Sequence, residues 1–508
     1  MIKKRNYVKL LLLILLIIQA QNLWDFNWIS DSAAPKNTNS SLAYTIEKSD
    51  LTRWFADSKY GINIAFFPEI YPDLKGKDLS DGTWDKMVTD FNVNMFAKDV
   101  VRTGAKYVIF SVGQTSGYYT SPSLTFMQAT NTKLGEYAPR RDLVKDIAIK
   151  LKEYNIPILV YAGVEGPIIA PPKITSTFPA INDQADAANR KTFNAMIREW
   201  SLRWKNNVSG WWLDGCYPWV AGLNDTPAGE KNVDTLIDAT KVGNKNAIST
   251  CNPSIGIFKA TSRKQDFMAG EEAYFHHYPR KRFISNKKQI QWHIMSFLGK
   301  DWSGLGTNRY QKRYLAEYIR GVNQNGGVVT VDMAVTPNGR IDSDQIGQMV
   351  YVKDVIRNHK ILQPNKNIAL YKPVYMISNN PDGHELPING NTYTHYATYA
   401  VDGIENGKTA QAAGEYAWSL LIDLQSLSRI KRSITHFSLK SFPTHYAILG
   451  SIDGKNWQKL VDREISKGGT YDDNFSSSKA RYIKVKSIKP DMAGMEGYQM
   501  SISEFELF

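Results

Sequence analysis

The feature that most constrains the fold is a repeated alternation of short apolar runs with amphipathic stretches between residues 48 and 362. The runs YGINIAFF, AKYVIFSV, IPILVYAG and SGWWLDG have the length and the β-branched and aromatic content of buried strands. Between them, TWDKMVTDFNVNMFAKDVVRTG and RRDLVKDIAIKLKEY have the pattern of helices. Repeated strand-helix units of this length predict a parallel sheet, either open or closed into a barrel.

From residue 363 to the C-terminus the pattern changes to short alternating strands separated by turn residues, which is typical of an all-β sandwich. Asp453 and Gly454 form a hairpin turn signal between two of these strands. A chain of 508 residues is also too long for one hydrophobic core. We therefore expect an α/β domain over residues 48–362 and an all-β domain over residues 363–508.

The N-terminus joins four basic residues among the first nine to an apolar run over residues 10–18. This pattern predicts a secretory signal peptide over residues 1–20, followed by a polar linker over residues 21–47. The protein is then exported to the periplasm, the cell surface or the medium, with an uncleaved N-terminal anchor as the alternative. Because the run is shorter than the ~20 residues of a membrane span, no stable membrane insertion is expected after the signal is removed.

The composition is that of a globular protein, with 43% hydrophobic and 22% charged residues. The two cysteines, Cys216 and Cys251, exclude a small disulfide-rich scaffold, and the sequence leaves open whether they pair. The net charge is +13, but there is no long basic tract or nucleic-acid motif. We therefore expect no nucleic-acid partner.

Several polar side chains directly follow the apolar runs. Gln114 and Thr115 follow YVIFSVG, Glu165 follows ILVYAGV, and Asp214 ends WWLD. In a parallel barrel, catalytic groups lie at the C-terminal ends of the strands, so these side chains are candidates for one site. Gly215 permits a sharp turn just after Asp214, which suits a rigidly held nucleophile, although a turn without a catalytic role is the alternative.

In their order along the chain, these motifs resemble the alpha-L-fucosidases of glycoside hydrolase family 29. The resemblance is carried by WFADSKYGINIAFFPEIYP, WDKMVTDFNVNMFAKDVVRTGAKYVIFSV, RRDLVKDIAIKLKEYNIPILVYAGV, WWLDG and VNQNGGVVTVDMAVTPNGRI. Together they cover roughly residues 50–358. The resemblance implies a (β/α)8-type barrel and a retaining glycosidase that acts on alpha-L-fucosyl or fucose-like residues.

The C-terminal region resembles a discoidin, or coagulation factor 5/8 type C, domain. The matching segments are NIALYKPV, YAVDGIENG, SLLIDLQSLSRIKR, YAILGSIDGKNWQKL, ARYIKVKS and ISEFELF. The resemblance implies a jelly-roll sandwich that binds a glycan and so raises the local concentration of the catalytic domain. Many such domains also carry a structural calcium ion, and a protein- or membrane-binding role is the alternative.

A retaining glycosidase needs a nucleophile and an acid/base whose carboxyl groups are ~5 to 5.5 Å apart. The resemblance assigns the nucleophile to Asp214. For the acid/base, the segment QDFMAGEEAY offers Glu271 and Glu272, and an Asp-Phe-x-x-x-Glu pattern in the family favours Glu271. The alternative is that one or both glutamates are surface charges on a loop.

The chain departs from the family at two histidine motifs that hold the sugar. Residues 66–69 read Phe-Phe-Pro-Glu in place of a His-Trp pair, and residues 113–119 lack a His-His pair. Another sugar is therefore a further candidate substrate, and a noncatalytic glycan-binding or adhesion protein is the alternative function. No catalytic metal is expected. The candidate substrate-binding residues are Glu69, Gln114, Thr115, Tyr118, Glu165, Trp212, Trp292 and His293.

Overall fold

The computed structural model describes residues 50–508 with gaps. The gaps are residues 168–169, 177–185, 218–222, 224–225, 276, 280–281, 286–288, 303, 307, 361, 363–365, 380–384, 388–396, 412–417 and 491–499. The predicted signal peptide and linker lie outside the described residues. No helix in the described part is long and apolar enough to cross a membrane.

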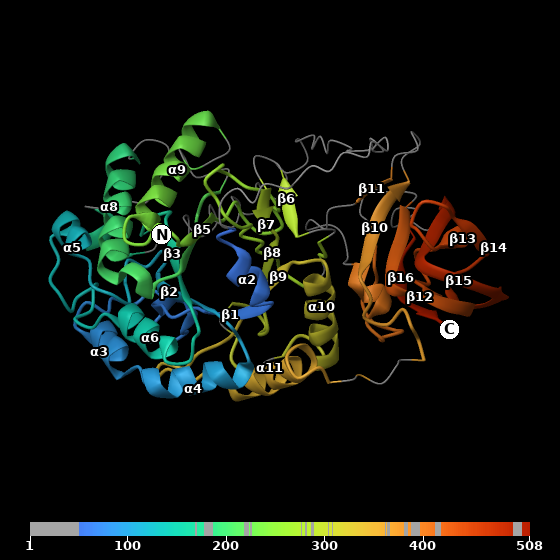
Figure 1. Ribbon diagram of the computed structural model, residues 1–508, viewed down its shortest axis with the longest axis horizontal. Helices are drawn as coiled ribbons and strands as arrows, with labels where there is room; N and C mark the ends of the chain where they lie inside the picture. The colour runs from blue at the N-terminus through green and yellow to red at the C-terminus, as the bar shows by residue number, and fades with distance from the viewer. Residues whose placement is uncertain are drawn as a thin grey trace, which may run out of the picture.

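The N-terminal domain is built on a parallel seven-stranded sheet with the order β5-β4-β3-β2-β1-β9-β8 (Figure 1). Every strand is buried over nearly its whole length, as the continuous apolar runs predict. The strands are β1 (Tyr60–Ile64), β2 (Val108–Gly113), β3 (Ile158–Gly163), β4 (Gly210–Asp214), β5 (Ile248–Cys251), β8 (His293–Phe297) and β9 (Val328–Asp332).

An irregular segment, residues 266–272, joins the two edges of this sheet. The Asp266 amide donates to Ser249 O of β5 at 2.9 Å, and the Met295 amide of β8 donates to Gly270 O at 2.8 Å. The Glu272 amide in turn donates to Met295 O at 2.9 Å. These bonds close the sheet into a barrel, so the predicted (β/α)8-type architecture is confirmed.

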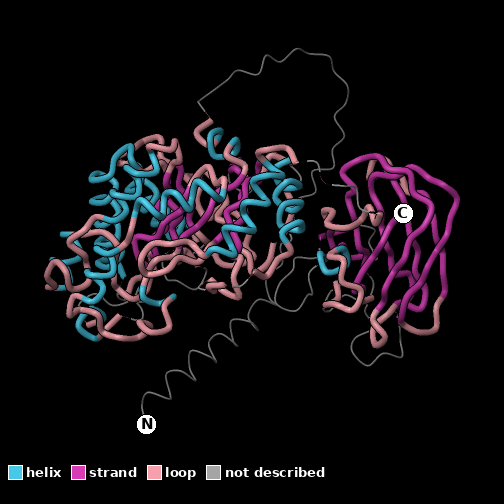
Figure 2. Tube along the Cα trace, turned by 90° about the horizontal axis from the view of Figure 1, so that it is seen from below, coloured by secondary structure: helices cyan, strands magenta, loops and turns pink. Residues whose placement is uncertain are grey.

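Helices surround the barrel (Figures 1 and 2). The stretch TWDKMVTDFNVNMFAKDVVRTG, predicted as one helix, forms two, because Asn92 has extended backbone and its side chain accepts from the Met95 amide at 3.0 Å, which starts a new helix. The helices are α2 (Arg53–Asp57), α3 (Thr83–Asp90), α4 (Val93–Thr103), α5 (Leu124–Thr130), α6 (Leu143–Lys152), α7 (Pro172–Thr175), α8 (Asp186–Trp204), α9 (Pro227–Lys241), α10 (Lys312–Gln324) and α11 (Ser343–Ile356), with short 3-10 turns at Pro68–Ile70 and Lys205–Asn207 and a hairpin of β6 (Phe283–Ser285) and β7 (Gln289–Gln291).

The C-terminal domain is an antiparallel sandwich with the strand order β11-β10-β12-β15-β13-β14, and β16 pairs with β12. The long strands β12 and β15 pair over most of their length with a register shift between Asp423 and Ser428, as expected where a ribbon bends from one layer to the next. The strands are β10 (Val374–Asn379), β11 (Glu385–Pro387), β12 (Trp418–Phe437), β13 (Pro443–Ser451), β14 (Gln458–Glu464), β15 (Gly469–Pro490) and β16 (Ile502–Leu507), with a 3-10 turn at Ala397–Val401.

The two domains are packed together, with β10 beside α10 (Figure 1). Tyr371, just before β10, belongs to the hydrophobic core of the barrel domain, and Tyr375 packs against the same core. The Tyr371 hydroxyl donates to Gln311 Oε1 at 2.6 Å, and Gln425 Nε2 donates to Gln324 Oε1 at 2.7 Å. The sandwich is therefore attached to the barrel through both ring packing and hydrogen bonds.

Candidate active site

Asp214 lies at the C-terminal end of β4 and is the most heavily hydrogen-bonded carboxylate of the barrel mouth. Its Oδ1 accepts from Asn252 Nδ2 and from the Tyr217 hydroxyl, both at 2.8 Å, and Oδ2 accepts from the Tyr161 hydroxyl. The Gly215 amide donates to Oδ1 at 3.0 Å. Donors on both oxygens stabilise the ionised form and fix its orientation, which suits a nucleophile.

Asn252 joins Asp214 to Glu271. Its Nδ2 donates to Asp214 Oδ1 at 2.8 Å and to Glu271 Oε2 at 2.6 Å. Because both oxygens lie on one nitrogen, they are at most 2.8 Å plus 2.6 Å, or 5.4 Å, apart. Glu271 reaches this position because residues 266–272 complete the barrel wall beside β8.

A disulfide between Cys216 and Cys251 lies directly beneath this pair, with Cα atoms 5.8 Å apart. Cys216 is two residues after Asp214, and Cys251 immediately precedes Asn252. Both cysteines are fully buried. The bridge therefore ties the end of β4 to the end of β5, next to the side chains that set the carboxyl spacing, and answers the pairing that the sequence left open.

Burial raises the pKa of Glu271 well above its ordinary value, and the negative charge of Asp214 raises it further. The same two causes raise the pKa of Glu165, at the mouth of the barrel after β3, to about 7. Glu165 packs directly on Gly215, where an added Cβ would come within 2.2 Å of Glu165 Cγ and where the backbone φ is 97°. Glycine is therefore required after Asp214, and a third carboxyl stands beside the pair.

Asp332, at the end of β9, is a further buried carboxyl in the barrel. Asn63 Nδ2 donates to its Oδ1 at 2.5 Å, and burial raises the pKa of Asp332 well above its ordinary value. The charge of Asp332 contributes to the raised pKa of Glu271. Asp332 and Asn252 were not among the sequence candidates, although each directly follows a buried strand, which is the signal that identified Asp214.

Glu69 and Thr115 lie together, on the segments that follow β1 and β2. Glu69 Oε1 accepts from the Ser116 amide at 2.7 Å and from the Thr115 hydroxyl at 3.2 Å, so Glu69 connects the loops after β1 and β2. Gln114 lies against the end of β3, 3.0 Å from the position of a Cβ on Gly163. The predicted contacts of these three residues with a sugar stay predictions.

The remaining candidates are buried among protein groups. Tyr118 donates to Asp78 Oδ1 at 3.1 Å, and Trp212 stacks on Tyr161 inside the barrel with ring centroids 5.3 Å apart. Trp292 belongs to the barrel-domain core. His293 is fully buried, with Nδ1 on the carbonyl groups of residues 268 and 269 and Nε2 on the Thr330 hydroxyl at 2.6 Å. The structure gives each of these four a packing role.

Glu272 points away from Asp214, although it is adjacent to Glu271 in the chain. Its carboxyl is 1% exposed, and it contacts His277 Nδ1 at 2.7 Å and the Tyr318 hydroxyl at 3.3 Å. Of the two glutamates proposed from sequence, it is Glu271 that shares a hydrogen-bond donor with Asp214.

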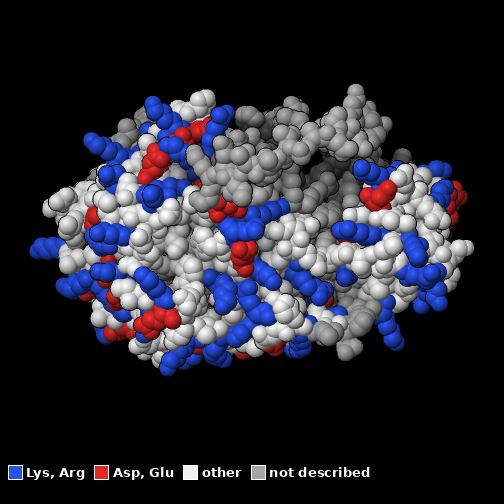
Figure 3. Space-filling model, viewed as in Figure 1, with Lys and Arg blue, Asp and Glu red and all other residues white. Residues whose placement is uncertain are grey.

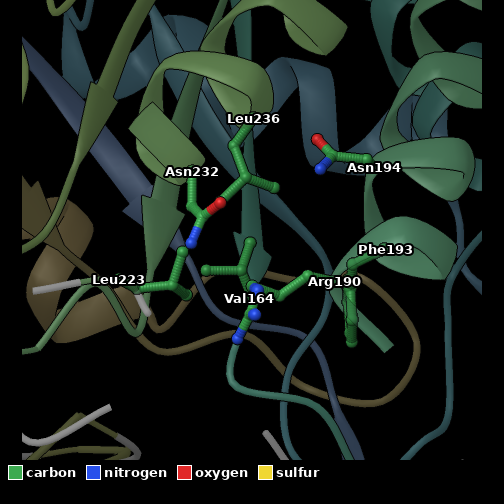
Figure 4. Close-up of a pocket in the computed structure, with 7 residues that line it drawn as sticks. All are labelled: Val164, Arg190, Phe193, Asn194, Leu223, Asn232 and Leu236. Carbon is green, nitrogen blue, oxygen red and sulfur yellow. The ribbon is translucent and has the colours of Figure 1, made fainter. Parts of the chain in front are cut away.

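A small cavity lies behind β3, between α8 and α9 (Figure 4). Its volume is about 10 Å³, which is room for one water molecule at most. It is therefore too small for a sugar. Its lining residues are Val164, Arg190, Phe193, Asn194, Leu223, Asn232 and Leu236.

Comparison with known proteins gives one family match. Residues 387–502 match the F5/8 type C domain. The resemblance of the C-terminal domain is thereby confirmed. A comparison with curated protein sequences finds no match.

Solved structures similar to the whole chain include three described as family 29 or fucosidase proteins. A Bacteroides thetaiotaomicron alpha-L-fucosidase structure is 12% identical over 94% of this chain and 99% of its own, with a TM-score of 0.46. A Ruminococcus gnavus family 29 fucosidase in complex with fucose is 13% identical over 90% and 94%, with a TM-score of 0.43. A family 29 member from a rumen bacterium is 12% identical over 91% and 98%, with a TM-score of 0.45. Identities this low do not transfer an activity.

The F5/8 type C domain contains two neighbouring carboxyl groups, the buried Glu504 and the half-buried Asp402. Glu504 accepts from the Gly403 amide at 3.0 Å, and burial together with the charge of Asp402 raises the pKa of Glu504 to about 9. Burial raises the pKa of Asp402 to about 7. Calcium prefers carboxylate and carbonyl oxygens, so Asp402 and Glu504 offer the type of ligand atom that this ion takes.

The surface charge is dispersed. On the face shown in Figure 3, Lys and Arg side chains are spread over both domains and are interspersed with Asp and Glu. Many of the cations are paired, for example Arg432 with Asp472 and Arg481 with Asp423. The net charge of +13 does not produce a single basic stripe on this face.

Proposed function

We propose that the protein is an exported, retaining glycoside hydrolase that releases alpha-L-fucosyl or fucose-like residues from a glycan or polysaccharide. The observation that carries this proposal is the single amide of Asn252, which donates to both Asp214 and Glu271 and so limits their oxygens to a separation of 5.4 Å. Retaining glycosidases have carboxyl groups ~5 to 5.5 Å apart, whereas inverting enzymes need ~6.5 to 9.5 Å to admit a water molecule.

In the first step, the Asp214 carboxylate attacks the anomeric carbon of the terminal sugar. Glu271 gives its proton to the glycosidic oxygen, the bond between this oxygen and the anomeric carbon breaks, and the aglycone leaves as an alcohol. A glycosyl ester on Asp214 results. The raised pKa of Glu271 supports this role, because the group must still carry a proton near neutral pH.

In the second step, water replaces the aglycone. Glu271, now ionised, takes a proton from this water as its oxygen attacks the anomeric carbon, and the ester bond to Asp214 breaks. The released sugar has the configuration of the substrate, and both carboxyl groups return to their starting states. Tyr161, Tyr217 and Asn252 donate to Asp214 and stabilise its negative charge as it leaves.

The other parts of the chain complete the proposal. Residues 1–20 direct export and residues 21–47 link the signal to the barrel, which places the enzyme in the periplasm, at the cell surface or in the medium. The F5/8 type C domain tethers the barrel to the polysaccharide, and a calcium ion held by Asp402 and Glu504 stabilises that domain. The domain boundary is near residue 362.

A noncatalytic glycan-binding protein is the second candidate function. It is favoured by the loss of the family's histidines at residues 66–69 and 113–119. Glu69, which stands in the first of these segments, is engaged by Thr115 and Ser116. The binding-only protein would retain sugar affinity without releasing product.

The experiment that separates the two is hydrolysis of aryl glycosides by the mature protein and its Asp214→Ala variant, with aryl alpha-L-fucoside first in the panel. Release from the fucoside that disappears in the variant supports the full proposal, and NMR of the first-formed anomer tests retention. Release from another glycoside keeps the chemistry and changes the sugar. No release from any panel member, together with glycan binding, supports the second candidate.

A further inference from the structure

We propose that the F5/8 type C domain is also a positioning part of the active site, because its tyrosines brace the segment that carries the acid/base. This brace segment is the described residues 271–275 and 277–278. The proposal rests on the proposed role of Glu271. It assigns Tyr399, Tyr375 and Tyr371 a function in catalysis that is separate from glycan binding.

The brace segment leaves the barrel wall immediately after the acid/base. The Glu272 amide donates to Met295 O of β8 at 2.9 Å, and Glu271 O accepts from the Gly256 amide at 2.8 Å. Beyond Glu272 the described residues of the segment form no regular strand or helix. Its position must therefore come from contacts with neighbouring elements, both hydrogen bonds to its backbone and packing of its side chains.

On the barrel side, a tyrosine row holds the segment by its backbone. Tyr310, Tyr314 and Tyr318 are four residues apart along α10 and its approach, and their rings follow one another at 5.8 and 6.4 Å. The Phe275 amide donates to the Tyr310 hydroxyl at 3.0 Å. The Tyr314 hydroxyl donates to Phe275 O, and the Tyr318 hydroxyl donates to the carbonyl of residue 277 at 2.6 Å.

On the other side, the F5/8 type C domain packs against the same segment and the same row. Tyr399 lies 5.8 Å from Tyr274, centroid to centroid. Tyr375 lies 6.2 Å from Tyr278 with its ring edge-on, at an interplanar angle of 66°. Two rings of the segment therefore each have a partner in the C-terminal domain.

The third tyrosine fixes the row itself. Tyr371 packs edge-on against Tyr314 at 5.8 Å, and its hydroxyl donates to Gln311 Oε1 at 2.6 Å, just before α10 begins. Arg309 closes the arrangement, since its guanidinium lies 5.2 Å from the Tyr274 ring centroid and donates to Ala273 O at 2.7 Å. The acid/base segment is thus enclosed by groups from both domains.

The consequence is a coupling between the domain interface and proton transfer. Losing one ring of the C-terminal domain would let the segment move and would admit water around Glu271. Because burial keeps the pKa of Glu271 raised, this water would lower that pKa. Because misplacement of a catalytic group by ~1 Å costs about 100-fold in rate, partial loosening by one missing ring should cost roughly 10-fold in kcat. KM should change little, since the ring contacts of Tyr399 are with Tyr274 and Lys408 and not with Asp214 or Glu271.

The test compares Tyr399→Ala with two controls in the full-length protein. Tyr399→Phe keeps the ring and should behave as the parent. Tyr471→Ala removes a tyrosine of the same domain whose ring packs on Phe437 and Tyr446, within that domain's own core, and so controls for general destabilisation. We expect kcat to fall roughly 10-fold only in Tyr399→Ala, with the alkaline limb of the pH profile moving to lower pH.

Hydrogen exchange of the backbone amides in residues 271–278 gives a readout that does not depend on activity. We expect faster exchange there in Tyr399→Ala than in Tyr399→Phe or Tyr471→Ala. A parent enzyme without activity would defeat the proposed function while leaving this readout intact. Unchanged exchange and an unchanged pH profile in a folded Tyr399→Ala variant would overturn the brace.

Discussion

The barrel and the sandwich each contain a pair of carboxyl groups of which one is buried and the other half-buried, and the two pairs are arranged differently. In the barrel, Asp214 and Glu271 share one amide donor, and Asp214 receives three further hydrogen bonds from Tyr161, Tyr217 and the backbone. In the sandwich, Asp402 and Glu504 receive bonds mainly from backbone amides of the loop at residues 403–404. The first pair is separated by a fixed spacer, and the second has no such spacer among the described contacts.

This difference indicates how each pair meets the cost of burying charge. Asp214 is surrounded by hydrogen-bond donors, while burial and the charge of Asp214 raise the pKa of its neighbour Glu271. Burial raises the pKa of both Asp402 and Glu504, so a cation that binds this pair would favour its ionised form. The barrel pair is suited to moving a proton, and the sandwich pair to holding an ion.

The substitution expected to have the largest effect on activity is Asp214→Asn. The substitution keeps the shape of the side chain and removes the nucleophilic charge, so we expect kcat/KM to fall by roughly 10⁴-fold or more, as when a catalytic nucleophile is removed. Aryl glycoside kinetics measure the loss. The matched control in the sandwich, Asp402→Asn, should retain activity, and comparable losses in the two variants would contradict separate roles for the two pairs.

Glu271→Gln should produce the next largest effect. Without a proton donor, kcat should fall by roughly 10²- to 10⁴-fold on substrates with poor leaving groups, and the alkaline limb of the pH profile should disappear. Glu272→Gln is the matched control, because Glu272 is the neighbouring residue and contacts His277 instead of Asn252. The Glu272→Gln variant should keep the alkaline limb of the pH profile. Loss of this limb in Glu272→Gln would reassign the acid/base to Glu272.

Much of the barrel could be predicted from the sequence because buried parallel strands produce continuous apolar runs. The rule that polar residues at strand ends share a site brought Glu165 and Asp214 together, and they do lie side by side around Gly215. The same rule applies to Asn252 and Asp332, which follow NAISTC and GGVVTV. They were missed because an Asn or Asp after a strand is equally typical of a turn.

The orientation of neighbouring side chains could not be predicted. Glu271 and Glu272 are adjacent in sequence, yet Glu271 faces Asp214 and Glu272 faces α10. The reason is that residues 266–272 take the place of a barrel strand, and side chains alternate between the two faces of a strand. His293, a predicted sugar ligand, is the first residue of β8 and its ring contacts the Thr330 hydroxyl, while its contact with a sugar stays a prediction. Such distinctions depend on strand register, which the sequence pattern does not specify here.

The stability of the sandwich should depend on both calcium and pH through the carboxyl groups of Asp402 and Glu504. The pKa of Glu504 is raised from 4.5 to about 9, so without calcium the stability contributed by its neutral form is complete below pH ~4.5 and is lost as the pH rises toward 9. Calcium binds the ionised form, so its effect should grow over the same interval. At about 100 times its Kd, calcium should raise the Tm of the sandwich transition by roughly 5 to 10 °C at pH 8 and by less at pH 6.

Calorimetry with calcium or EDTA measures this shift, and magnesium tests ion selectivity. Glu504→Gln should abolish the calcium response and flatten the pH dependence, because the neutral amide has no proton to lose. Glu165→Gln is the control from the barrel and should keep the response. A calcium response that is equal in Glu504→Gln and the parent would place the ion elsewhere.

The smallest expected effect belongs to the third carboxyl of the barrel, Glu165. Its charge is the smallest of the named causes that raise the pKa of Glu271, after burial, Asp214 and Asp332. Glu165→Gln removes that charge and keeps the side-chain contact with Gly215, so the pKa of Glu271 should fall. The alkaline limb of kcat/KM should then move to lower pH by less than about one unit, and kcat at the optimum should change by less than about 3-fold. A shift to higher pH would mean that Glu165 acts on Glu271 through structure and not through charge, because removing a negative neighbour can only make ionisation easier.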